Sequence, residues 1–418
     1  MLAQMAVLLL LLPLSNMLLF SVVIPVFNRE QSLENALQSV INQSFQNFEV
    51  LIVDDGSEPV IANKIKQLIV NFQDQRLKLL RHKTNKNGAA ARNTGIGAAS
   101  GQYVCFLDSD DIWLPNKLEL VFNCINTQNP SDYFLIHHQY RNSKNGVLAE
   151  ALPKISKGSY ESVAHYSFVT NDVGGIQSST ICVPIELAKR CLFDERFSGH
   201  QDWDFALQVG AFTRHFYFIS EPLTIRNKDS DYGVADGLSW QYSLWFYTQR
   251  ASYFDNDSAL HYFKRVVLRK AVFGLGILGV IKNKLLMRIL LTKPYATSKV
   301  LVSFIELVFQ QQRRVRQVDL ACKRRNVKSL MIWGANDYAK SLILGVNENL
   351  KVLRVIDSKA LNSQVKIHGI DVTPLTSISK EELSEADALV LATDNHQESM
   401  KKDLSDICPT LLSKIIEY

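Results

Sequence analysis

The sequence predicts an α/β protein, in which helices cover both faces of mainly parallel sheets. Three observations support this prediction. Apolar runs of strand length alternate with segments in which apolar residues recur every three or four positions. Several of the apolar runs end in carboxylates or glycine. The alternation stops in a basic middle region and restarts near residue 327, so we expect two sheet domains within the 418 residues.

The composition is that of an ordinary globular protein, with 47% hydrophobic residues, 21% charged residues and a net charge of +5. None of the six cysteines forms a CxxC pair, and most lie in apolar surroundings. This pattern argues against a disulfide framework or a zinc site. It predicts the reduced, buried thiols of a cytosolic protein.

Residues 1–16 are strongly apolar, but no Lys or Arg precedes the apolar stretch and no A-x-A cleavage site follows it. The stretch is also shorter than the roughly 20 residues that cross a bilayer. Met17 is a natural start, directly before a strand. We therefore interpret residues 1–16 as an over-extended start or an apolar extension, with a membrane-contacting segment as the alternative.

Strands and helices alternate in the first part of the chain. The strands are continuous apolar runs, which are typical of a parallel sheet buried on both faces. The helices carry apolar residues on one side only. This order predicts a doubly wound domain with its ligand site at the carboxyl ends of the strands. The expected strands span 18–26, 48–53 and 77–81, and the expected helices follow Glu30 and span about 60–71.

Polar residues follow these strands at the expected ligand edge. The second strand ends in Asp54 and Asp55, just before a glycine turn. A later helix, within residues 85–96, is rich in small residues and can approach both the sheet and a ligand closely. Its Arg92 can point at a phosphate or a carboxylate. A surface ion pair is the alternative for this side chain.

The most informative stretch is QYVCFLDSDDIWLP, residues 102–115. A short apolar strand ends there in Asp108-Ser109-Asp110-Asp111, which places three carboxylates within four residues. These carboxylates repel one another and are costly to bury without a cation. A divalent metal that carries a diphosphate removes this conflict, because hard cations bind carboxylate oxygens. The alternative is a helix cap, in which Asp111 starts a helix at the next residue.

Four stretches in this order carry a resemblance to a known family: SVVIPVFNRE, FEVLIVDDGS, NGAAARNTGIGAASGQYVCFLDSDDIW and GHQDWDF. Together they resemble the family 2 glycosyltransferases of the GT-A fold, over about residues 18–230. The resemblance implies a mixed, mainly parallel sheet between helices and inversion at the anomeric carbon. It also implies a nucleotide-sugar donor, with a UDP-sugar as the first candidate, and Mn²⁺ or Mg²⁺ as cofactor. The acceptor would be a glycan or lipid-linked glycan of cell-surface polysaccharide biosynthesis.

The resemblance also assigns roles to single residues. Asp202 would be the catalytic base that takes the proton of the acceptor hydroxyl, with Asp204 as the fallback. The family usually has Glu directly before this Asp, and Gln201 stands there in this sequence. Asp108 and Asp110 would bind the metal ion. The donor would be bound by Pro25, Val26, Phe27, Glu30, Asp54, Asp55, Arg92, Asp108 and Ser109.

The acceptor half of the expected domain has fewer motifs. Apolar or alternating runs predict strands at 134–140, 176–183 and 216–225. Arg226 follows the last of these strands, and the resemblance makes it a phosphate contact, although the His that often accompanies it is absent. Acceptor choice is expected to depend on the loops of residues 140–175 and 227–240.

Residues 262–325 contain fifteen Lys and Arg but only two acidic residues, with apolar stretches between them. Basic amphipathic helices of this kind suit an anionic membrane surface. We therefore expect a peripheral protein on the cytoplasmic face of the membrane, with a plain helical linker bundle as the alternative. Nucleic acid is not an expected partner, because no nucleic-acid-binding motif accompanies the charge.

From residue 327 a strand, a glycine turn, a helix and a second strand ending in an acidic residue follow one another. This is the order of a mononucleotide-binding half. The segment resembles the small Rossmann-like domains found ahead of some sugar acetyltransferases and in CoA-binding proteins. Its candidate nucleotide site consists of Gly334, Asn336 and Asp357. Asn336 stands where a second glycine is usual, so a structural or regulatory module is the alternative.

These patterns define the expected domains and the rival functions. Two alternatives to a working transferase stay open. One is a catalytically degenerate protein that only binds a nucleotide-sugar, and the other is a bifunctional enzyme with an active C-terminal nucleotide or CoA site. The expected parts are the extension at 1–16, a glycosyltransferase domain at 17–240, a basic amphipathic helical region at 241–325 and the Rossmann-like domain at 326–418.

Overall fold

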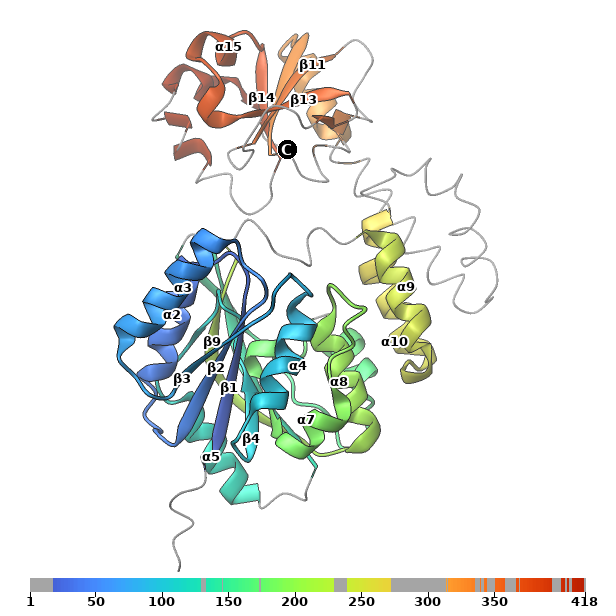
Figure 1. Cartoon of the computed structure of the whole chain (residues 1–418). Helices are drawn as coiled ribbons and strands as arrows, with labels where there is room; N and C mark the ends of the chain where they lie inside the picture. The colour runs from blue at the N-terminus through green and yellow to red at the C-terminus, as the bar shows by residue number, and fades with distance from the viewer. Residues whose placement is uncertain are drawn as a thin grey trace, which may run out of the picture. The chain divides into compact units, whose positions relative to one another are not determined.

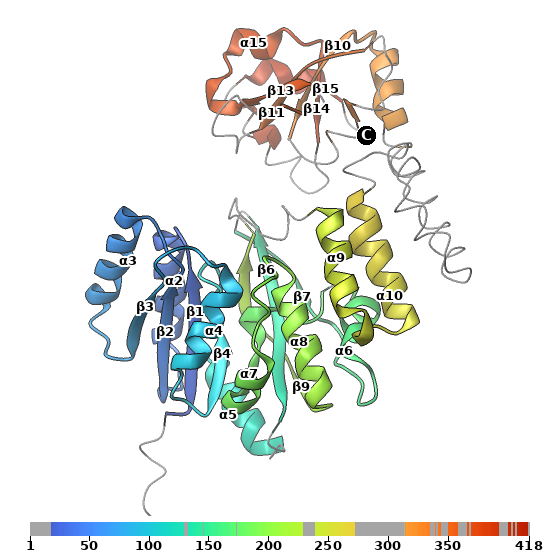
Figure 2. The ribbon, with the colours of Figure 1, turned by 45° about the vertical axis from the view of Figure 1, so that its right-hand side comes forward.

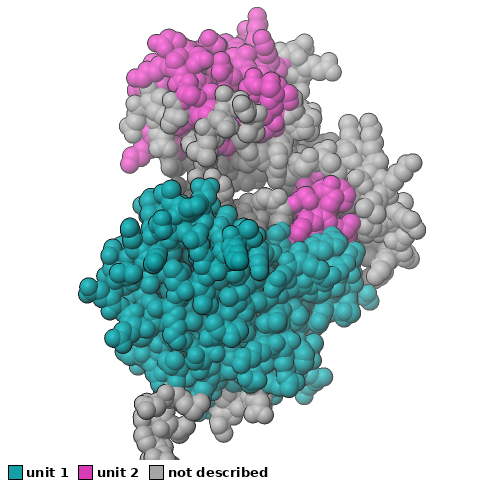
Figure 3. Space-filling view, viewed as in Figure 1, with its two compact units in different colours: residues 1–238, 245–261 teal, residues 239–244, 262–418 magenta. Residues whose placement is uncertain are grey.

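The chain folds as two compact units in the computed structural model (Figures 1 and 3). One consists of residues 1–238 and 245–261, and the other of residues 239–244 and 262–418. The expected extension at 1–16 lies outside the described residues, as do residues 272–312 and 314 of the basic region. The structure describes residues 18–228 without 129–132, 145 and 173, residues 239–271, and 313–416 without 314, 335–338, 340–341, 344–349, 358–365, 368, 393–399, 403 and 406–407.

The first unit is built on one mixed sheet, which has nine strands within the described residues. The strand order is β3-β2-β1-β4-β8-β6-β9-β5, and β7 pairs with β6 (Figure 2). The first four strands of this order are parallel, β8 and β5 run antiparallel to their neighbours, and β6 is parallel to β9. The strands are β1 (Phe20–Val26), β2 (Phe48–Asp54), β3 (Leu77–Arg81), β4 (Tyr103–Phe106), β5 (Ile112–Trp113), β6 (Leu135–Lys144), β7 (Val147–Leu152), β8 (Cys182–Pro184) and β9 (Phe216–Asn227).

Helices cover both faces of this sheet because the central strands are apolar on both sides. Val22 and Ile24 of β1 pack in one core with the buried side of α2, whereas Val23 lies against α4 on the opposite face. The first unit is thus a GT-A-like α/β domain, as the sequence predicted. Its helices are α2 (Glu30–Ile41), α3 (Pro59–Phe72), α4 (Gly88–Ala98), α5 (Lys117–Gln128), α6 (Val163–His165), α7 (Ile185–Cys191), α8 (Gln201–Phe212), α9 (Trp240–Arg250) and α10 (Asn256–Tyr262).

Two expectations for this unit differ from the structure. The strand expected at 176–183 is shortened to β8, because residues 178–180 form a 3₁₀ turn that carries Ser179 toward the acidic stretch. The unit also includes residues 245–261, which lie beyond the expected boundary at 240. Arg250 of α9 explains this extension, since it forms ion pairs with Asp194 and Asp204.

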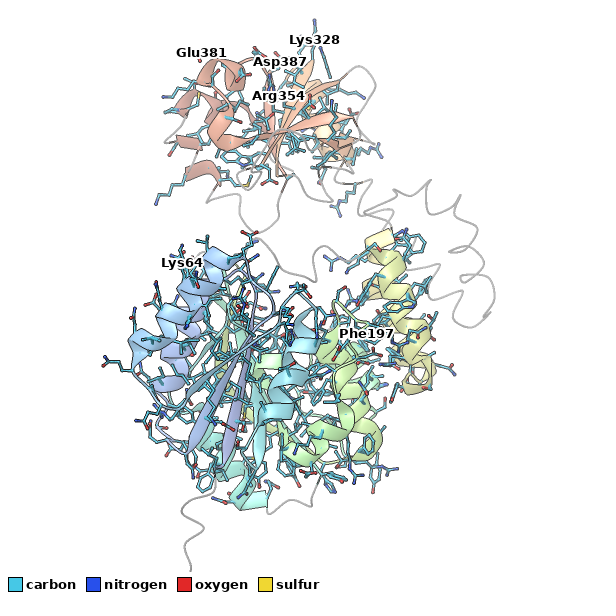
Figure 4. All side chains as sticks on the ribbon, viewed as in Figure 1. Lys64, Phe197, Lys328, Arg354, Glu381 and Asp387 are labelled. Carbon is cyan, nitrogen blue, oxygen red and sulfur yellow. The ribbon has the colours of Figure 1, made fainter. Side chains whose placement is uncertain are left out.

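The second unit contains a separate sheet of six strands within its described residues, in the order β12-β13-β11-β10-β14-β15. All neighbours are parallel except β12 and β13. Asp387, labelled in Figure 4, accepts hydrogen bonds from the backbone N–H groups of Lys328 and Ser329 and so joins the starts of β14 and β10. The elements are β10 (Ser329–Trp333), β11 (Lys351–Asp357), β12 (Lys366–Ile367), β13 (Ile370–Pro374), α15 (Lys380–Ser384), β14 (Ala388–Leu391) and β15 (Ile415–Ile416).

The candidate nucleotide site of the second unit is only partly described. Gly334 directly follows β10 with φ of 111°, a conformation that glycine adopts without strain. Asp357 ends the neighbouring parallel strand β11. Asn336 lies outside the described residues. The order of the parallel strands matches a doubly wound sheet, and Gly334 and Asp357 lie at the ends of the adjacent strands β10 and β11.

Two further features concern the whole chain. All six cysteines are free and five of them are buried, while Cys124 on α5 is partly exposed. Within the described part of the chain, no helix has both the length and the apolar character needed to cross a membrane.

Candidate active site

The polar residues singled out by the sequence gather at the carboxyl ends of β1, β2 and β4. Strand β1 leads into Phe27, whose side chain is 42% exposed, and β2 ends at Asp54. Strand β4 leads into the acidic stretch that starts at Asp108. Because the three strands are parallel neighbours, their ends form one edge of the sheet, which is where open α/β sheets bind ligands.

Asp108 is held by a buried arginine. Arg92 of α4 forms an ion pair with the Asp108 carboxylate, and its other terminal nitrogen donates to Gln201 Oε1 at 2.7 Å. The Arg92 guanidinium also lies over the ring of Phe193, 5.3 Å from its centroid. Arg92 thus contacts a carboxylate at this edge of the sheet, and Gln201 accepts the hydrogen bond that fixes the orientation of its guanidinium.

Asp110 is held by a second arginine from another part of the chain. Arg29 Nη1 lies 2.6 Å from Asp110 Oδ2, and the two side chains are 26% and 16% exposed. Arg29 immediately precedes α2. Sequence reasoning did not assign a role to Arg29, although it lies within the quoted stretch SVVIPVFNRE.

Asp111 is a buried anchor of the acidic stretch. Ser179 Oγ donates to its carboxylate at 2.6 Å, and the backbone N–H of Asn227 donates to the other oxygen at 3.2 Å. Burial, together with the charges of Asp108 and Asp110, raises the pKa of Asp111 to about 8. The alternative of a helix cap is wrong, because the residues after Asp111 form β5, which pairs with β9.

Asp202 lies in the first turn of α8 and is partly buried. Its carboxylate accepts the backbone N–H of Trp203 at 2.9 Å. Burial raises the pKa of Asp202, and the charge of Asp108 adds to this effect, while Arg226 and Arg92 oppose it. These mutual effects place Asp202 in the same electrostatic cluster as the acidic stretch.

Asp204 cannot serve as the fallback base. It is fully buried, forms an ion pair with Arg250 and accepts a hydrogen bond from Gln208 at 2.8 Å. The buried Asp204 carboxylate forms its ion pair with Arg250, so its role is to hold α9 against α8. The structure therefore corrects this alternative and leaves Asp202 as the candidate on α8.

Asp54 and Asp55, the carboxylates predicted to bind the nucleoside, lie at this edge of the sheet, but both form hydrogen bonds within the protein. Asp55 contacts His82 Nδ1 at 2.7 Å and accepts the backbone N–H groups of Lys86 and Asn87, which shapes the loop before α4. Asp54 accepts the N–H of Ser57 at 2.9 Å. Both are buried.

The remaining predicted donor residues lie around these carboxylates. Pro25 and Val26 end β1, and Ser109 is buried within the acidic stretch. Glu30 instead pairs with Lys64 of α3 at 3.0 Å, a residue labelled in Figure 4. The structure thus turns the Glu30 carboxylate toward α3.

The acidic stretch offers a donor set that suits a divalent ion. Among the described residues, no three His, Cys, Asp or Glu side chains are close enough to hold a metal. Asp108 and Asp110 together supply two carboxylates, which are hard oxygen ligands. A Mg²⁺ or Mn²⁺ ion bound by two carboxylates keeps its other coordination positions for water and phosphate oxygens. Their charges already disfavour ionisation of Asp111, so a cation would relieve this repulsion. The residues therefore fit a divalent ion that arrives with a diphosphate.

Two residues of this cluster had weak or no support in the sequence. Ser179 links two members of the acidic stretch, since it accepts the N–H of Asp108 at 3.1 Å and donates to Asp111. No motif marked it, because its partners lie some seventy positions away. Arg226 lies close enough to Asp111 and Asp202 to feel their charges. Burial lowers the pKa of Arg226, but these two carboxylates outweigh that effect and raise the pKa above its ordinary value.

Comparison with known proteins adds independent information. The chain matches the model of glycosyl transferase family 2 over residues 21–172. The amylovoran biosynthesis glycosyltransferase AmsB of Erwinia amylovora is 36% identical over 232 residues, which are 54% of this chain and 76% of that protein. The UDP-Glc:alpha-D-GlcNAc-diphosphoundecaprenol beta-1,3-glucosyltransferase WfgD of Escherichia coli is 40% identical over 102 residues, which are 24% of this chain and 39% of that protein.

A solved structure of Staphylococcus aureus TarS 1-349 in complex with UDP-GlcNAc is also similar, with 19% sequence identity and a TM-score of 0.48. The similarity covers 73% of this chain and 86% of that one.

Proposed function

This chain belongs to glycosyltransferase family 2, and from that membership we propose that it is an inverting, metal-dependent transferase of polysaccharide biosynthesis. It moves a sugar from a nucleotide-sugar donor to a glycan or lipid-linked glycan. The main support is that Arg92 bridges Asp108, which follows β4, and Gln201, the residue directly before Asp202 on α8. This contact supports a base and a diphosphate site close to each other at one sheet edge.

The chemistry that we assign to this edge is a single in-line displacement. The acceptor hydroxyl oxygen forms a bond to the anomeric carbon, while the bond from that carbon to the diphosphate oxygen breaks and its electron pair leaves with the diphosphate. Asp202 takes the hydroxyl proton, and its raised pKa makes it a stronger base than an exposed aspartate. Because the attack comes from the side opposite the leaving group, the anomeric centre inverts.

Asp108 and Asp110 would hold the divalent ion. An ion bound there would neutralise the negative charge that develops on the leaving diphosphate. Arg92 would orient Asp108 and lie beside the nucleotide, since it is fixed between Asp108 and Gln201. Pro25, Val26, Phe27, Ser109, Asp54 and Asp55 complete the proposed donor side, and Glu30 belongs to it only if it leaves Lys64.

The relatives support the proposed substrates. WfgD is named for transfer from UDP-Glc to a sugar linked to diphosphoundecaprenol, and AmsB is named for amylovoran biosynthesis. By analogy, we assign a UDP-sugar donor and a glycan or lipid-linked acceptor to this chain. A peripheral position on the cytoplasmic face of the membrane would bring the site close to a lipid-linked acceptor.

A thermal-shift panel of UDP-, GDP- and dTDP-sugars, each with and without Mn²⁺, tests this proposal. A ligand that binds only the folded state raises its apparent stability. We expect a Mn²⁺-dependent shift with one nucleotide class, and we expect Asp110→Ala to remove it while the unliganded protein still unfolds cooperatively. Folded protein that shifts with no donor would overturn the donor assignment. A donor-dependent shift without sugar transfer would favour the degenerate alternative, which the replacement of the usual Glu by Gln201 also supports.

A further inference from the structure

We propose that Arg29 is a donor-binding residue that exchanges partners. Without donor it holds Asp110, and in the donor complex it contacts the diphosphate after Asp110 has turned to the metal ion. This inference rests on the proposed function, and it adds a residue for which neither the motifs nor the comparisons give a role.

The contact that supports the exchange is a direct ion pair at the metal-binding aspartate. Arg29 Nη1 and Asp110 Oδ2 are 2.6 Å apart, and the two residues are 81 positions apart in the chain. This pair is therefore a tertiary contact between the entry to α2 and the acidic stretch. Both side chains keep some exposure, 26% for Arg29 and 16% for Asp110, so a ligand can reach them from solvent.

Arg29 differs from the other arginine at this edge in how firmly it is held. Arg92 is only 8% exposed, bonds to both Asp108 and Gln201, and lies over the Phe193 ring. Arg29 is about three times more exposed than Arg92. A change of partner therefore costs less packing at Arg29, while Arg92 is built to stay in place.

Charge balance gives the exchange its direction. Asp110 can give both of its carboxylate oxygens to a divalent ion only when it releases the guanidinium that now contacts Oδ2. Arg29 would then lose the Asp110 carboxylate as a partner in a partly buried position, and a nearby anion that takes its place offsets this loss. The diphosphate that binds with the ion is such an anion, and the planar guanidinium matches phosphate oxygens in a two-point hydrogen bond.

The same exchange would assist the reaction. The diphosphate gains negative charge as its bond to the anomeric carbon breaks. A guanidinium that contacts it is bound more strongly in the transition state than in the ground state, which is the condition for a faster chemical step. Arg226 is less suited to this task, because Asp111 and Asp202 already balance its charge.

Isothermal titration of the full chain with two probes tests the exchange: Mn²⁺ alone, and UDP at saturating Mn²⁺. For Arg29→Gln we expect Mn²⁺ alone to bind several-fold more tightly, because the Arg29 guanidinium no longer competes with the ion for Asp110. We expect UDP with Mn²⁺ to bind about 10-fold more weakly or worse, since a hydrogen bond between charged groups is lost. Arg29→Lys keeps the positive charge but loses the two-point hydrogen bond of the guanidinium. It should therefore recover part of the UDP affinity.

The matched control is Arg76→Gln, which breaks an arginine–aspartate pair of the same kind with Asp74, just before β3. It should leave both affinities at wild-type values. Equal weakening of both probes in Arg29→Gln, or no change in either, would overturn the exchange while the wild type still binds UDP. Absence of Mn²⁺-dependent UDP binding in the wild type would overturn the proposed donor, and the role of Arg29 with it.

Discussion

At the scale of single residues, three neighbouring aspartates have three different environments. Asp108 pairs with Arg92, Asp110 pairs with Arg29, and Asp111 is buried against Ser179. Only the first two keep exposure that a ligand could use. The third holds the stretch in place through β9, so we expect it to support the site from beneath.

The first residue-scale prediction concerns Asp202→Asn. The amide keeps the size of the carboxylate but cannot take a proton, so transfer should fall by about 10²–10⁴-fold, the usual contribution of a general base. Donor binding, measured by titration with Mn²⁺ present, should stay within a few-fold of wild type. Transfer at the wild-type rate would remove Asp202 from its assigned role.

A second residue-scale prediction concerns pH. His137 is fully buried, and burial together with the charge of Lys157 lowers its pKa to about 3. The unfolded chain takes up a proton near the ordinary pKa of about 6.5, whereas the folded chain does not. The contribution of neutral His137 to the free energy of unfolding should therefore be fully present above pH 6.5. It should fall as the pH drops below 6.5.

His137→Phe should remove part of this acid sensitivity. The ring sits among Tyr166 and Phe218, so an aromatic side chain is compatible with the site. Between pH 6.5 and 5 the variant should lose about 2 kcal/mol less unfolding free energy than wild type, from about 1.4 kcal/mol per pH unit for one proton. Urea denaturation at both pH values measures this, and identical losses in the two proteins would contradict it.

At this scale the sequence predicted residue types better than partners. It predicted Asp108 and Asp110 at a strand end and Arg92 on a helix rich in small residues, and it assigned Asp202 through the family resemblance. It missed Ser179, whose role depends on a turn that brings it to the acidic stretch from a distant part of the chain. A one-dimensional pattern does not contain such long-range contacts.

At the scale of elements, α4 approaches the sheet unusually closely. A Cβ atom on Gly95 would lie 2.3 Å from Cγ1 of Val23 on β1, which is too short for any real contact. The small residues of α4 thus allow the helix that carries Arg92 to pack directly on the strand beside β4. The sequence predicted this close approach from the small residues alone.

Gly95→Ala should therefore lower the free energy of unfolding by about 1–3 kcal/mol, the usual cost of overpacking a core. Gly97→Ala on the same helix is the matched control, because a Cβ there meets nothing within 4 Å. The control should stabilise the protein by about 0.5–1 kcal/mol through helix propensity. Chemical denaturation of both variants gives the comparison, and changes of the same sign would contradict the close packing.

Element prediction succeeded for the parallel strands and failed where side chains redirected the backbone. The first three strands occur within two residues of their expected bounds. The strand expected at 176–183 did not form in full, because Ser179 bonds through both its side chain and its carbonyl, which accepts Trp113 Nε1 at 2.8 Å. Periodicity alone could not distinguish this buried turn of Ser178–Thr180 from a strand.

At the scale of the whole molecule, the transferase unit ends later than the sequence indicated. Residues 245–261 belong to it, and Arg250 supplies the cation that balances buried Asp204. The sequence prediction set the boundary at 240, after the loop that follows the last expected strand. The composition could not show which of these helices pairs with the catalytic unit.

A pair of fragments tests this boundary. Residues 18–261 should fold and keep Mn²⁺-dependent donor binding, whereas residues 18–244 should unfold at a clearly lower temperature. Arg250→Met in the full chain should cost about 3–5 kcal/mol, the price of leaving a buried carboxylate without its cation. Equal melting temperatures of the two fragments would show that α9 and α10 do not stabilise the catalytic unit.

The cysteine distribution has a practical consequence for labelling. Five of the six thiols are buried, so a maleimide dye under native conditions should react first with Cys124 on α5. The wild-type protein could then carry a single fluorophore without any engineered cysteine.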